Sequence, residues 1–423
     1  MTEPINEQVT LPKLEHVHRA ASRLKGVIHR TPLMHNLLLS EQTNAQVWLK
    51  REDLQIVRSY KIRGAYNKMS SLPQGEVQQG IVCASAGNHA QGVALACQKL
   101  GIPGTIFMPQ PTPQQKVQQV QMFGKDFVQI ELTGDTFDDA YQEAMRYCKT
   151  HQKAFIHPFN DPAIIEGQGT VGLEIIEDTP DTIDYVLAPI GGGGLIAGLA
   201  AVFKTISPST KIIGVEPAGA PAMKNSLVAG KVVTLDTIDK FVDGAAVKQV
   251  GSLTFAICQQ LVDEVVTVPE GKVCSTILEL YNKQAIVAEP AGAMTIAALE
   301  QLRPALAGKN VVCIVSGSNN DITRTQEIKE RSLLYEGLKH YFIIRFAQRA
   351  GALREFLTDV LGPKDDIVLF EYSKKNYREK GPALVGIELE QAADFELLIE
   401  RMNQKNIKYE YVNNRQDLFH YLI

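Results

Sequence analysis

Four consecutive glycines lie between two apolar stretches of this sequence, at 185–189 and 195–203. The pattern predicts a turn from a buried strand into a helix. Glycines let the backbone approach a ligand closely, and the N–H groups of a helix N-terminus favour negative charge. The segment therefore suits a phosphate, although an ordinary tight turn would also use glycine. It comprises Gly191, Gly192, Gly193, Gly194 and Leu195.

A second polar segment also lies between an expected strand (80–84) and a helical pattern (91–100). Its backbone N–H groups could hold a substrate carboxylate, and a side-chain amide could reach a ring hydroxyl. The alternative is an ordinary capped helix start, with Ser85 or Asn88 as the N-cap. His89 by itself is better explained as a packed histidine than as an acid–base catalyst. The candidate ligand-binding residues are Ser85, Ala86, Gly87 and Asn88.

Lys61 and Ser316 are two further candidates that no local pattern decides. Lys61 follows Tyr60 at an expected helix start, where a lysine is usually solvated. If it were buried, desolvation would favour the neutral amine, which can form a Schiff base. Ser316 ends an expected strand, where its hydroxyl could bond a ring nitrogen, but turns also use serine.

The elements that must position these residues alternate between strand and helix. Helical spacing, as at 91–100 and 136–150, separates most of the short apolar runs. Such alternation predicts an α/β fold with parallel sheets covered on both faces, which bind ligands at the carboxyl ends of their strands. The expected strands are 46–49, 80–84, 104–108, 126–131, 154–157, 185–189, 211–216 and 310–316.

The C-terminal part has a different pattern, beginning after a charged connector near 331–339. Two helices with one apolar face each alternate with four strands in the order βαββαβ. This order predicts a separate small α+β domain with its helices on one side of an antiparallel sheet. The expected elements are 340–346, 351–361, 366–372, 383–389, 392–403 and 408–412.

Composition narrows the classes of function. With 423 residues, 45% hydrophobic and 21% charged, the chain is expected to fold into two or three globular domains. A net charge of −4, without a basic block, argues against nucleic acid as a partner. The most apolar stretch, at 195–203, is far shorter than the roughly 20 residues of a membrane span. The polar N-terminus and six scattered cysteines predict a protein of the reducing cytoplasm, without membrane association.

Taken together and in order, the motifs resemble the threonine/serine dehydratases, which are pyridoxal-phosphate enzymes of the tryptophan-synthase-β fold. The resemblance covers residues 10–325, and the tail resembles the ACT-like domain of the short biosynthetic threonine dehydratases, in one copy. The motifs are Arg30-Thr31-Pro32-Leu33, Ser59-Tyr60-Lys61-Ile62-Arg63-Gly64-Ala65, the 85–92 segment, His157-Pro158-Phe159, Gly167-Gln168-Gly169-Thr170, the glycine run, Glu289-Pro290-Ala291-Gly292-Ala293 and Ser316-Gly317-Ser318-Asn319.

The resemblance implies a role for each candidate. Lys61 would carry the cofactor as a Schiff base and act as the general base, and Ser316 would bond the pyridine nitrogen. Asn88 would bind the cofactor's 3′-oxygen, and the glycine run with Leu195 would hold its phosphate. Ser85, with the backbone of Ala86, Gly87 and Asn88, would bind the substrate carboxylate. Gly351, in a turn at 348–353, would leave the backbone open to an amino-acid effector.

The resemblance also implies an activity and an organisation. A lyase of this kind converts L-threonine, and secondarily L-serine, to a 2-oxo acid and ammonia by β-elimination through enamine and imine intermediates. From threonine the product is 2-oxobutanoate, in the first step of isoleucine biosynthesis. The catalytic domain would span 1–335 and the ACT-like regulatory domain 339–413. Isoleucine, opposed by valine, would be the effector, and the chain would form a homodimer or homotetramer.

Some positions depart from the family pattern. Glu166 replaces the usual alanine before Gly167 and is expected close enough to the site to affect substrate preference. A related racemase subgroup binds a cation on Glu-x-x-x-Ala-x-Asp. The last position here is Ala222, so no divalent-metal site is expected after Glu216.

Three rivals remain. A serine racemase or catabolic dehydratase would not need the tail. A catalytically silent amino-acid sensor would lack Lys61, which is present. A Rossmann oxidoreductase would carry a dinucleotide fingerprint at its strand-to-helix turn, and the glycine run at 191–194 does not have the G-x-G-x-x-G spacing.

Overall fold

The structure is a computed structural model that describes residues 11–179, 181–347, 349–372, 380–413 and 415. The chain divides into two compact units, Met1–Asp321 and Ile322–Ile423. The helix α15 (Thr325–Tyr335) therefore belongs to the second unit, and the boundary expected between 335 and 339 lies inside that unit.

A six-stranded sheet forms the larger lobe of the first unit. Its order is β1-β2-β10-β7-β8-β9, and every neighbouring pair is parallel except β1 with β2. The sequence did not predict β1 or β9. The strands are β1 (Leu33–His35), β2 (Gln46–Arg51), β7 (Tyr185–Pro189), β8 (Lys211–Pro217), β9 (Glu264–Val268) and β10 (Asn310–Val315).

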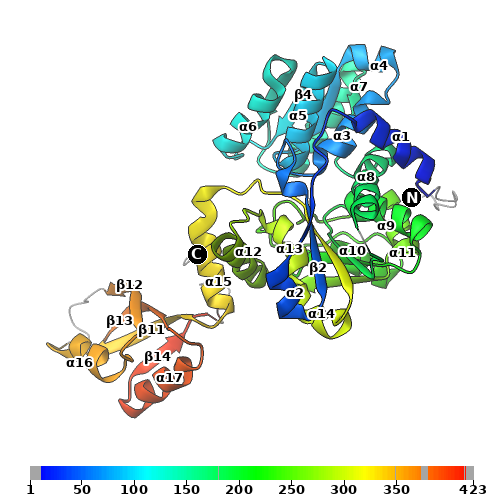
Figure 1. The fold of residues 1–423 in the computed structure, drawn as a ribbon. Coiled ribbons are helices and arrows are strands. Elements are labelled where there is room, and N and C mark those ends of the chain that lie inside the picture. Colours follow the sequence, from blue (N-terminus) through cyan, green and yellow to red (C-terminus); the bar gives the residue numbers. More distant parts are fainter. Residues whose placement is uncertain (1–10, 180, 348, 373–379, 414, 416–423) are drawn as a thin grey trace. The chain divides into compact units, whose positions relative to one another are not determined.

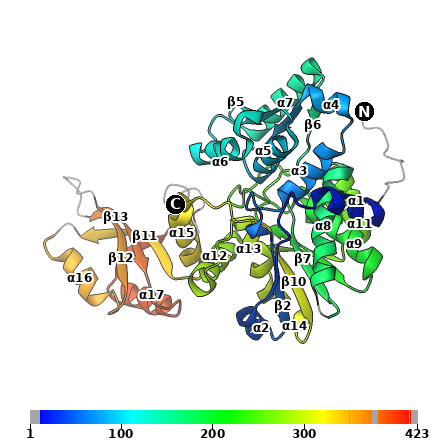
Figure 2. The same ribbon diagram turned by 45° about the horizontal axis from the view of Figure 1, so that its top comes forward.

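A four-stranded parallel sheet of order β5-β4-β3-β6 forms the smaller lobe, drawn in blue to cyan in Figures 1 and 2. Two predicted strands are shorter than expected, because residues 125–127 form a 3-10 turn before β5 and β6 ends at Phe155. The strands are β3 (Ile81–Ala84), β4 (Gly104–Met108), β5 (Val128–Leu132) and β6 (Ala154–Phe155).

Helices cover both lobes, and α3 packs against α5 of the smaller lobe and α8 of the larger. Helix α9 is buried almost throughout because its sequence is nearly all apolar, and it packs closely on α8. The helices of the first unit are α1 (Leu14–Leu24), α2 (Leu37–Thr43), α3 (Lys61–Ser70), α4 (Gln74–Gln79), α5 (Asn88–Leu100), α6 (Gln114–Gly124), α7 (Phe137–His151), α8 (Pro162–Asp178), α9 (Gly194–Ile206), α10 (Ala222–Ala229), α11 (Ser252–Leu261), α12 (Glu270–Gln284), α13 (Pro290–Ala297) and α14 (Leu299–Leu306).

The second unit has the predicted βαββαβ order, and its antiparallel sheet has the order β12-β13-β11-β14. Phe342, Phe356 and Leu398 lie in its core, and the second helix buries the apolar face that predicted it. The first helix buries only part of its predicted face, because Leu353 and Leu357 are exposed. The elements after α15 are β11 (Lys339–Ala347), α16 (Ala352–Asp359), β12 (Asp366–Tyr372), β13 (Lys380–Glu388), α17 (Asp394–Gln404) and β14 (Lys408–Tyr411).

Two sequence features concern the molecule as a whole. All six cysteines are buried free thiols, as their apolar surroundings predicted. Among the described residues, no helix has the length and apolar character needed to span a membrane.

Candidate active site

The carboxyl end of β10 lies beside the start of α3. Ser59 and Gly317 form an isolated β-bridge, and the backbone N–H of Tyr60 donates to the carbonyl oxygen of Ser316 at 3.3 Å. Two candidates far apart in the sequence, Lys61 and Ser316, are therefore held by one short pairing of backbones.

Lys61 is the first residue of α3, and its side chain is directed into the protein. The Nζ atom donates a hydrogen bond to the carbonyl oxygen of Pro158 at 3.0 Å and lies 5.4 Å from the centre of the Tyr60 ring. Burial lowers the pKa of its amine to about 8, against the opposing effect of the Glu289 carboxylate. The burial that the sequence left undecided favours the neutral, nucleophilic amine.

The glycine run forms a tight loop between β7 and α9. Gly193 has a positive φ of 94°, and a Cβ atom at Gly192 would overlap the ring of Phe159. The carbonyl oxygen of Gly192 accepts hydrogen bonds from Thr254 Oγ1 at 2.6 Å and from the Gly251 N–H at 3.4 Å, which fix the loop. Within the described residues, the N–H groups from Gly191 to Leu195 have no acceptor, so they fit a phosphate.

The segment at 157–160 connects the glycine loop to Lys61. Pro158 accepts the lysine hydrogen bond, and Phe159 packs against Gly192 and Gly194. His157 Nδ1 accepts the N–H groups of Phe159 and Asn160 at 3.2 and 2.8 Å. Burial lowers the pKa of His157 to about 4, so the neutral ring is available as this acceptor.

Asn88 does not cap α5, contrary to one of the two interpretations of the sequence. Gly87 occupies the N-cap position, and Ser85 Oγ accepts the N–H of Gly87 at 3.3 Å. The Asn88 side chain instead donates to Glu289 Oε1 at 2.7 Å and accepts from Asn319 Nδ2 at 2.6 Å. These contacts connect the segment containing Ser85, Ala86, Gly87 and Asn88 to the loop after Ser316.

The side chains of His89 and Glu166 each bond a residue outside the proposed cofactor site. His89 bonds the carbonyl oxygen of Ile156 at 2.9 Å, and burial, helped by Lys61, lowers its pKa to about 3. Glu166 was expected to affect the site, but its carboxylate bonds His16 Nδ1 of α1 at 2.9 Å. That contact places the Glu166 side chain on α1, because position 166 lies on the face of α8 that packs there.

The carboxylate of Glu216, at the end of β8, is bound by backbone donors. It accepts the N–H groups of Met223 and Lys224 at 2.7 and 2.8 Å, at the start of α10. Burial nevertheless raises the pKa of Glu216 to about 7. Across the described residues, no cluster of three or more histidine, cysteine or acidic side chains could hold a metal ion.

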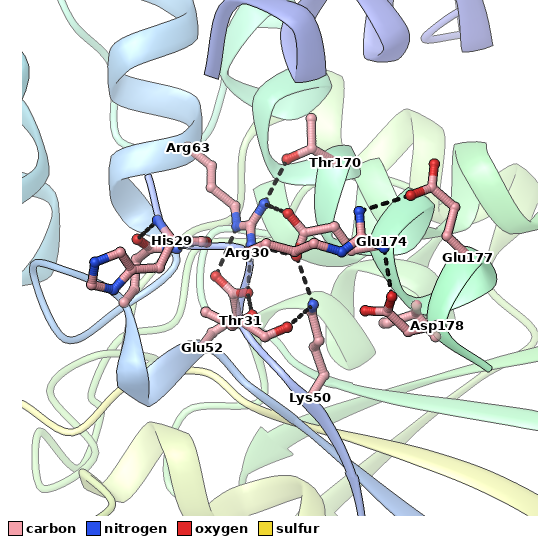
Figure 3. A network of polar contacts seen from close by, with 12 residues as sticks. His29, Arg30, Thr31, Lys50, Glu52, Arg63, Thr170, Glu174, Glu177 and Asp178 are labelled. Carbon is pink, nitrogen blue, oxygen red and sulfur yellow. Dashed lines mark hydrogen bonds and ion pairs between the residues drawn. The ribbon is translucent and has the colours of Figure 1, made fainter. Parts of the chain in front are cut away.

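A buried ionic network, which the sequence did not predict, surrounds Arg63 (Figure 3). Arg63 donates to both oxygens of Glu52, at 2.8 and 2.7 Å, and to both oxygens of Glu174, at 2.7 and 2.8 Å. Lys50 Nζ contacts Glu174 at 2.6 Å and the carbonyl oxygen of Thr31 at 2.6 Å. Arg63, Glu52 and Lys50 are fully buried.

This network joins α3 to α8 and to the end of β2. Its central residue, Arg63, lies two residues after Lys61 in the sequence. A buried arginine with two carboxylates is costly to desolvate, and it fixes geometry through paired hydrogen bonds. Arg63 belongs to the same sequence motif as Lys61, and this was the one sign in the sequence that position 63 could matter to the site. The sequence did not show which acids it would meet.

Gly351, the candidate of the second unit, begins the turn into α16 with a positive φ of 89°. A Cβ atom there would meet no atom of the described residues within 4 Å, so they leave the backbone open at this point. Gln348, in the same predicted turn, lies outside the described residues.

Comparison with known proteins gives two family matches. Residues 24–317 match the family described as "Pyridoxal-phosphate dependent enzyme". Residues 330–422 match "C-terminal regulatory domain of Threonine dehydratase".

Two curated relatives are biosynthetic L-threonine dehydratases. The protein of Halalkalibacterium halodurans is 58% identical over 97% of this chain and 99% of its own length. The protein of Bacillus subtilis is 56% identical over the full length of both chains. Among solved structures, threonine deaminase isoform 2 of Solanum lycopersicum in its processed form is 39% identical, with a TM-score of 0.71 over 78% of this chain and 99% of its own. Maize serine racemase is 32% identical, with a TM-score of 0.71 over 77% and 99%.

Proposed function

This chain belongs to the pyridoxal-phosphate dependent enzymes and, among them, to the biosynthetic L-threonine dehydratases, and from this premise we propose how its residues divide the reaction. The overall conversion is from L-threonine to 2-oxobutanoate and ammonia, the first step of isoleucine biosynthesis. L-Serine is the proposed secondary substrate.

The residues of the first unit fit the cofactor. The partly buried Lys61 amine suits an aldehyde. Among the described residues, the five N–H groups of the glycine loop and one N–H of the Asn88 amide have no acceptor, and they suit a phosphate and a ring oxygen. When bound, pyridoxal phosphate delocalises the electron pair left by removal of the substrate α-proton. Lys61 would hold the cofactor covalently, the loop of Gly191, Gly192, Gly193, Gly194 and Leu195 its phosphate, and Asn88 its 3′-oxygen.

Lys61 would also be the general base. With the cofactor bound to a substrate amino acid instead of to Lys61, the free Lys61 amine would be placed to accept the α-proton. Its lowered pKa, about 8, makes the neutral form available near physiological pH. His89 is a poor alternative as the base, because its ring bonds the carbonyl oxygen of Ile156 and burial lowers its pKa to about 3.

Ser316 and the 85–88 segment would set the outcome. A neutral serine hydroxyl beside the pyridine nitrogen leaves that nitrogen uncharged, unlike an aspartate, and thereby favours elimination over transamination. Ser85, with the backbone of Ala86, Gly87 and Asn88, would bind the substrate carboxylate. Loss of the α-proton and the β-hydroxyl as water would leave an enamine, whose imine tautomer reacts with water to give 2-oxobutanoate and ammonia.

The observation that carries this proposal is the partly buried Lys61 amine, which is directed inward onto the Pro158 carbonyl oxygen beside the glycine loop. The test is to incubate purified full-length protein, supplied with pyridoxal phosphate, with L-threonine, L-serine and D-threonine. We expect 2-oxo acid from L-threonine first and L-serine second. D-Serine as the main product from L-serine would favour the racemase alternative, which the likeness to maize serine racemase motivates.

The second unit matches a regulatory domain, and we propose that it binds an amino-acid effector at the turn containing Gly351. Isoleucine as an inhibitor, opposed by valine, is the proposed pair. We also propose functional domains at 1–335 and 339–413, a homodimer or homotetramer, and a cytoplasmic location. Calorimetry with isoleucine and valine tests effector binding. If neither amino acid gives a heat of binding at millimolar concentration, the second unit would serve only in subunit assembly.

A further inference from the structure

A buried carboxylate, that of Glu289, lies in the proposed site without a role in the reaction described above. Its residue is only 5% exposed, and it begins the turn into α13. The side chain packs so closely on the backbone of Gly317 that a Cβ atom there would overlap it. Glu289 therefore lies between Asn88 and the loop that follows Ser316.

Both oxygens of this carboxylate accept hydrogen bonds from groups of fixed position. Oε1 accepts from Asn88 Nδ2 at 2.7 Å, and Oε2 accepts from the backbone N–H of Asn319 at 3.2 Å. A carboxylate is an acceptor at both oxygens, whereas a glutamine of the same shape accepts at only one. Glutamine at 289 would thus turn an NH₂ group toward one of the two donors.

The hydrogen bonds continue from Asn88 to Asn319 in one direction. Asn319 Nδ2 donates to Asn88 Oδ1 at 2.6 Å and to the carbonyl oxygen of Val57 at 3.0 Å. Turning the Asn319 amide over would place its oxygen against two acceptors. This row of hydrogen bonds thus ends at two groups that only accept, the Val57 carbonyl and the Glu289 carboxylate. These two ends fix which way the amide groups of Asn319 and Asn88 face.

The consequence is the direction of the Asn88 amide. Its oxygen is used by Asn319, one N–H is used by Glu289, and the described residues offer no acceptor for the second N–H. We infer that Glu289 is a positioning residue, which makes Asn88 a hydrogen-bond donor toward the ring oxygen of the cofactor. The inference rests on the proposed function, because Asn88 is assigned to that oxygen there.

The surroundings of Glu289 decide the conditions of the test. Burial, with Asp243, raises the pKa of its carboxyl to about 7, against the effects of Asn88, Asn319 and Lys116. Tyr60 and Lys61 are the other titratable groups that its charge affects. Measurements at mildly alkaline pH keep the carboxylate charged.

The test compares two cofactors on full-length apoenzyme, pyridoxal phosphate and 3-deoxypyridoxal phosphate, which lacks the ring hydroxyl. For each variant, the ratio of the dissociation constants of the two cofactors measures its preference for the ring hydroxyl. We expect Glu289→Gln to lower this preference by about 10- to 100-fold, the range for a hydrogen bond to a charged group. Equal loss of affinity for both cofactors would mean that Glu289 only packs, and would overturn the inference.

A conservative variant separates chemistry from shape. Glu289→Asp is shorter than the native residue but still accepts at both oxygens, whereas glutamine keeps the shape and loses one acceptor. Aspartate should keep more of the hydroxyl preference than glutamine, and the opposite order would overturn the inference. This comparison also serves if Glu289→Gln folds poorly.

Two further variants complete the design. Glu216→Gln, at another buried carboxylate with two N–H donors, should change affinity for both cofactors by the same factor. Asn88→Ala should lose the hydroxyl preference as Glu289→Gln does. If Asn88→Ala loses it and Glu289→Gln does not, the inference fails while the proposed site stands. If Asn88→Ala keeps it, the assignment of Asn88 itself is wrong.

Discussion

The amine of Lys61 has two properties that suit it to the proposed chemistry. It is desolvated enough for its pKa to fall to about 8, and it keeps one hydrogen bond, to Pro158. The same motif on an exposed helix would carry an ordinary charged lysine. The chemistry of this residue is therefore a consequence of burial beside the glycine loop.

Replacing Lys61 with alanine should remove covalent attachment of the cofactor and lower dehydration of L-threonine by at least about 10²-fold, the usual loss without a general base. Intact mass after borohydride reduction measures attachment, and circular dichroism checks that the fold survives. Residual turnover above about 1% of the native rate would exclude Lys61 as the base.

The pH dependence of cofactor attachment should follow the Lys61 pKa. Only the neutral amine attacks an aldehyde, and a lowered pKa makes that form available at lower pH. Attachment to apoenzyme should accelerate about tenfold per pH unit below 8 and level off above it. Stopped-flow absorbance measures the rate. A rate still climbing toward the ordinary lysine pKa of 10.5 would show a solvated amine.

Ser316→Asp should place a negative charge beside the pyridine nitrogen and stabilise its protonated form. We expect slower elimination from L-threonine together with new transamination or racemisation products. Chromatography of the products on a chiral column gives their ratio. Unchanged rate and unchanged products would mean that Ser316 does not contact the nitrogen.

At the scale of elements, α3 is held by charges as well as by apolar packing. Its inner face carries Arg63, whose partners come from the turn after β2 and from α8 (Figure 3). The network does not touch the cofactor candidates directly. It holds α3 in place, and Lys61 is the first residue of that helix. The contacts that stabilise the fold therefore also position Lys61.

Arg63→Met should cost about 3–5 kcal/mol of unfolding free energy, because it leaves the buried carboxylate of Glu52 without its cationic partner, while Glu174 keeps Lys50. Arg30→Met is the matched control. Its ion pairs with Glu177 and Asp178 are largely exposed, so about 1 kcal/mol or less is expected. The chain's single tryptophan, Trp48, lies in β2 and reports urea unfolding of the first unit. Equal losses in the two variants would contradict a structural role for the buried network.

At the scale of the whole molecule, the two units have separate cores and separate candidate sites. The first contains every proposed catalytic residue, and the second contains Gly351. Allostery between them requires an effector that binds differently in two states of the enzyme, and its effect must be reciprocal. Isoleucine that weakens threonine binding must itself bind more weakly when threonine is present.

A chain ending at Asp321, where the first unit ends, should keep dehydratase activity and lose its response to isoleucine. The cut avoids α15, which a truncation near Arg331 would split. Initial rates with and without isoleucine test this, with full-length protein as the control. A truncated enzyme that stays equally sensitive would place the effector site in the first unit.

The sequence by itself determined the elements whose signal is local. Alternating apolar runs predicted most strands of the two parallel sheets, and amphipathic spacing predicted the βαββαβ unit. The glycine loop and the resemblance indicated the cofactor family, which the comparisons confirmed. β1 was not predicted because three residues carry too little pattern, and it exists through antiparallel pairing with β2.

The tertiary structure decided everything that depends on partners distant in the sequence. Asn88 could have been an N-cap, and it became part of a hydrogen-bonded chain because Glu289 and Asn319 lie 201 and 231 residues away in sequence but in contact in space. Arg63 and Lys61 belong to one motif, yet only folding showed that Arg63 is paired with buried carboxylates and that the pKa of Lys61 is lowered. Burial sets pKa values and amide directions, and burial is a property of the assembled fold.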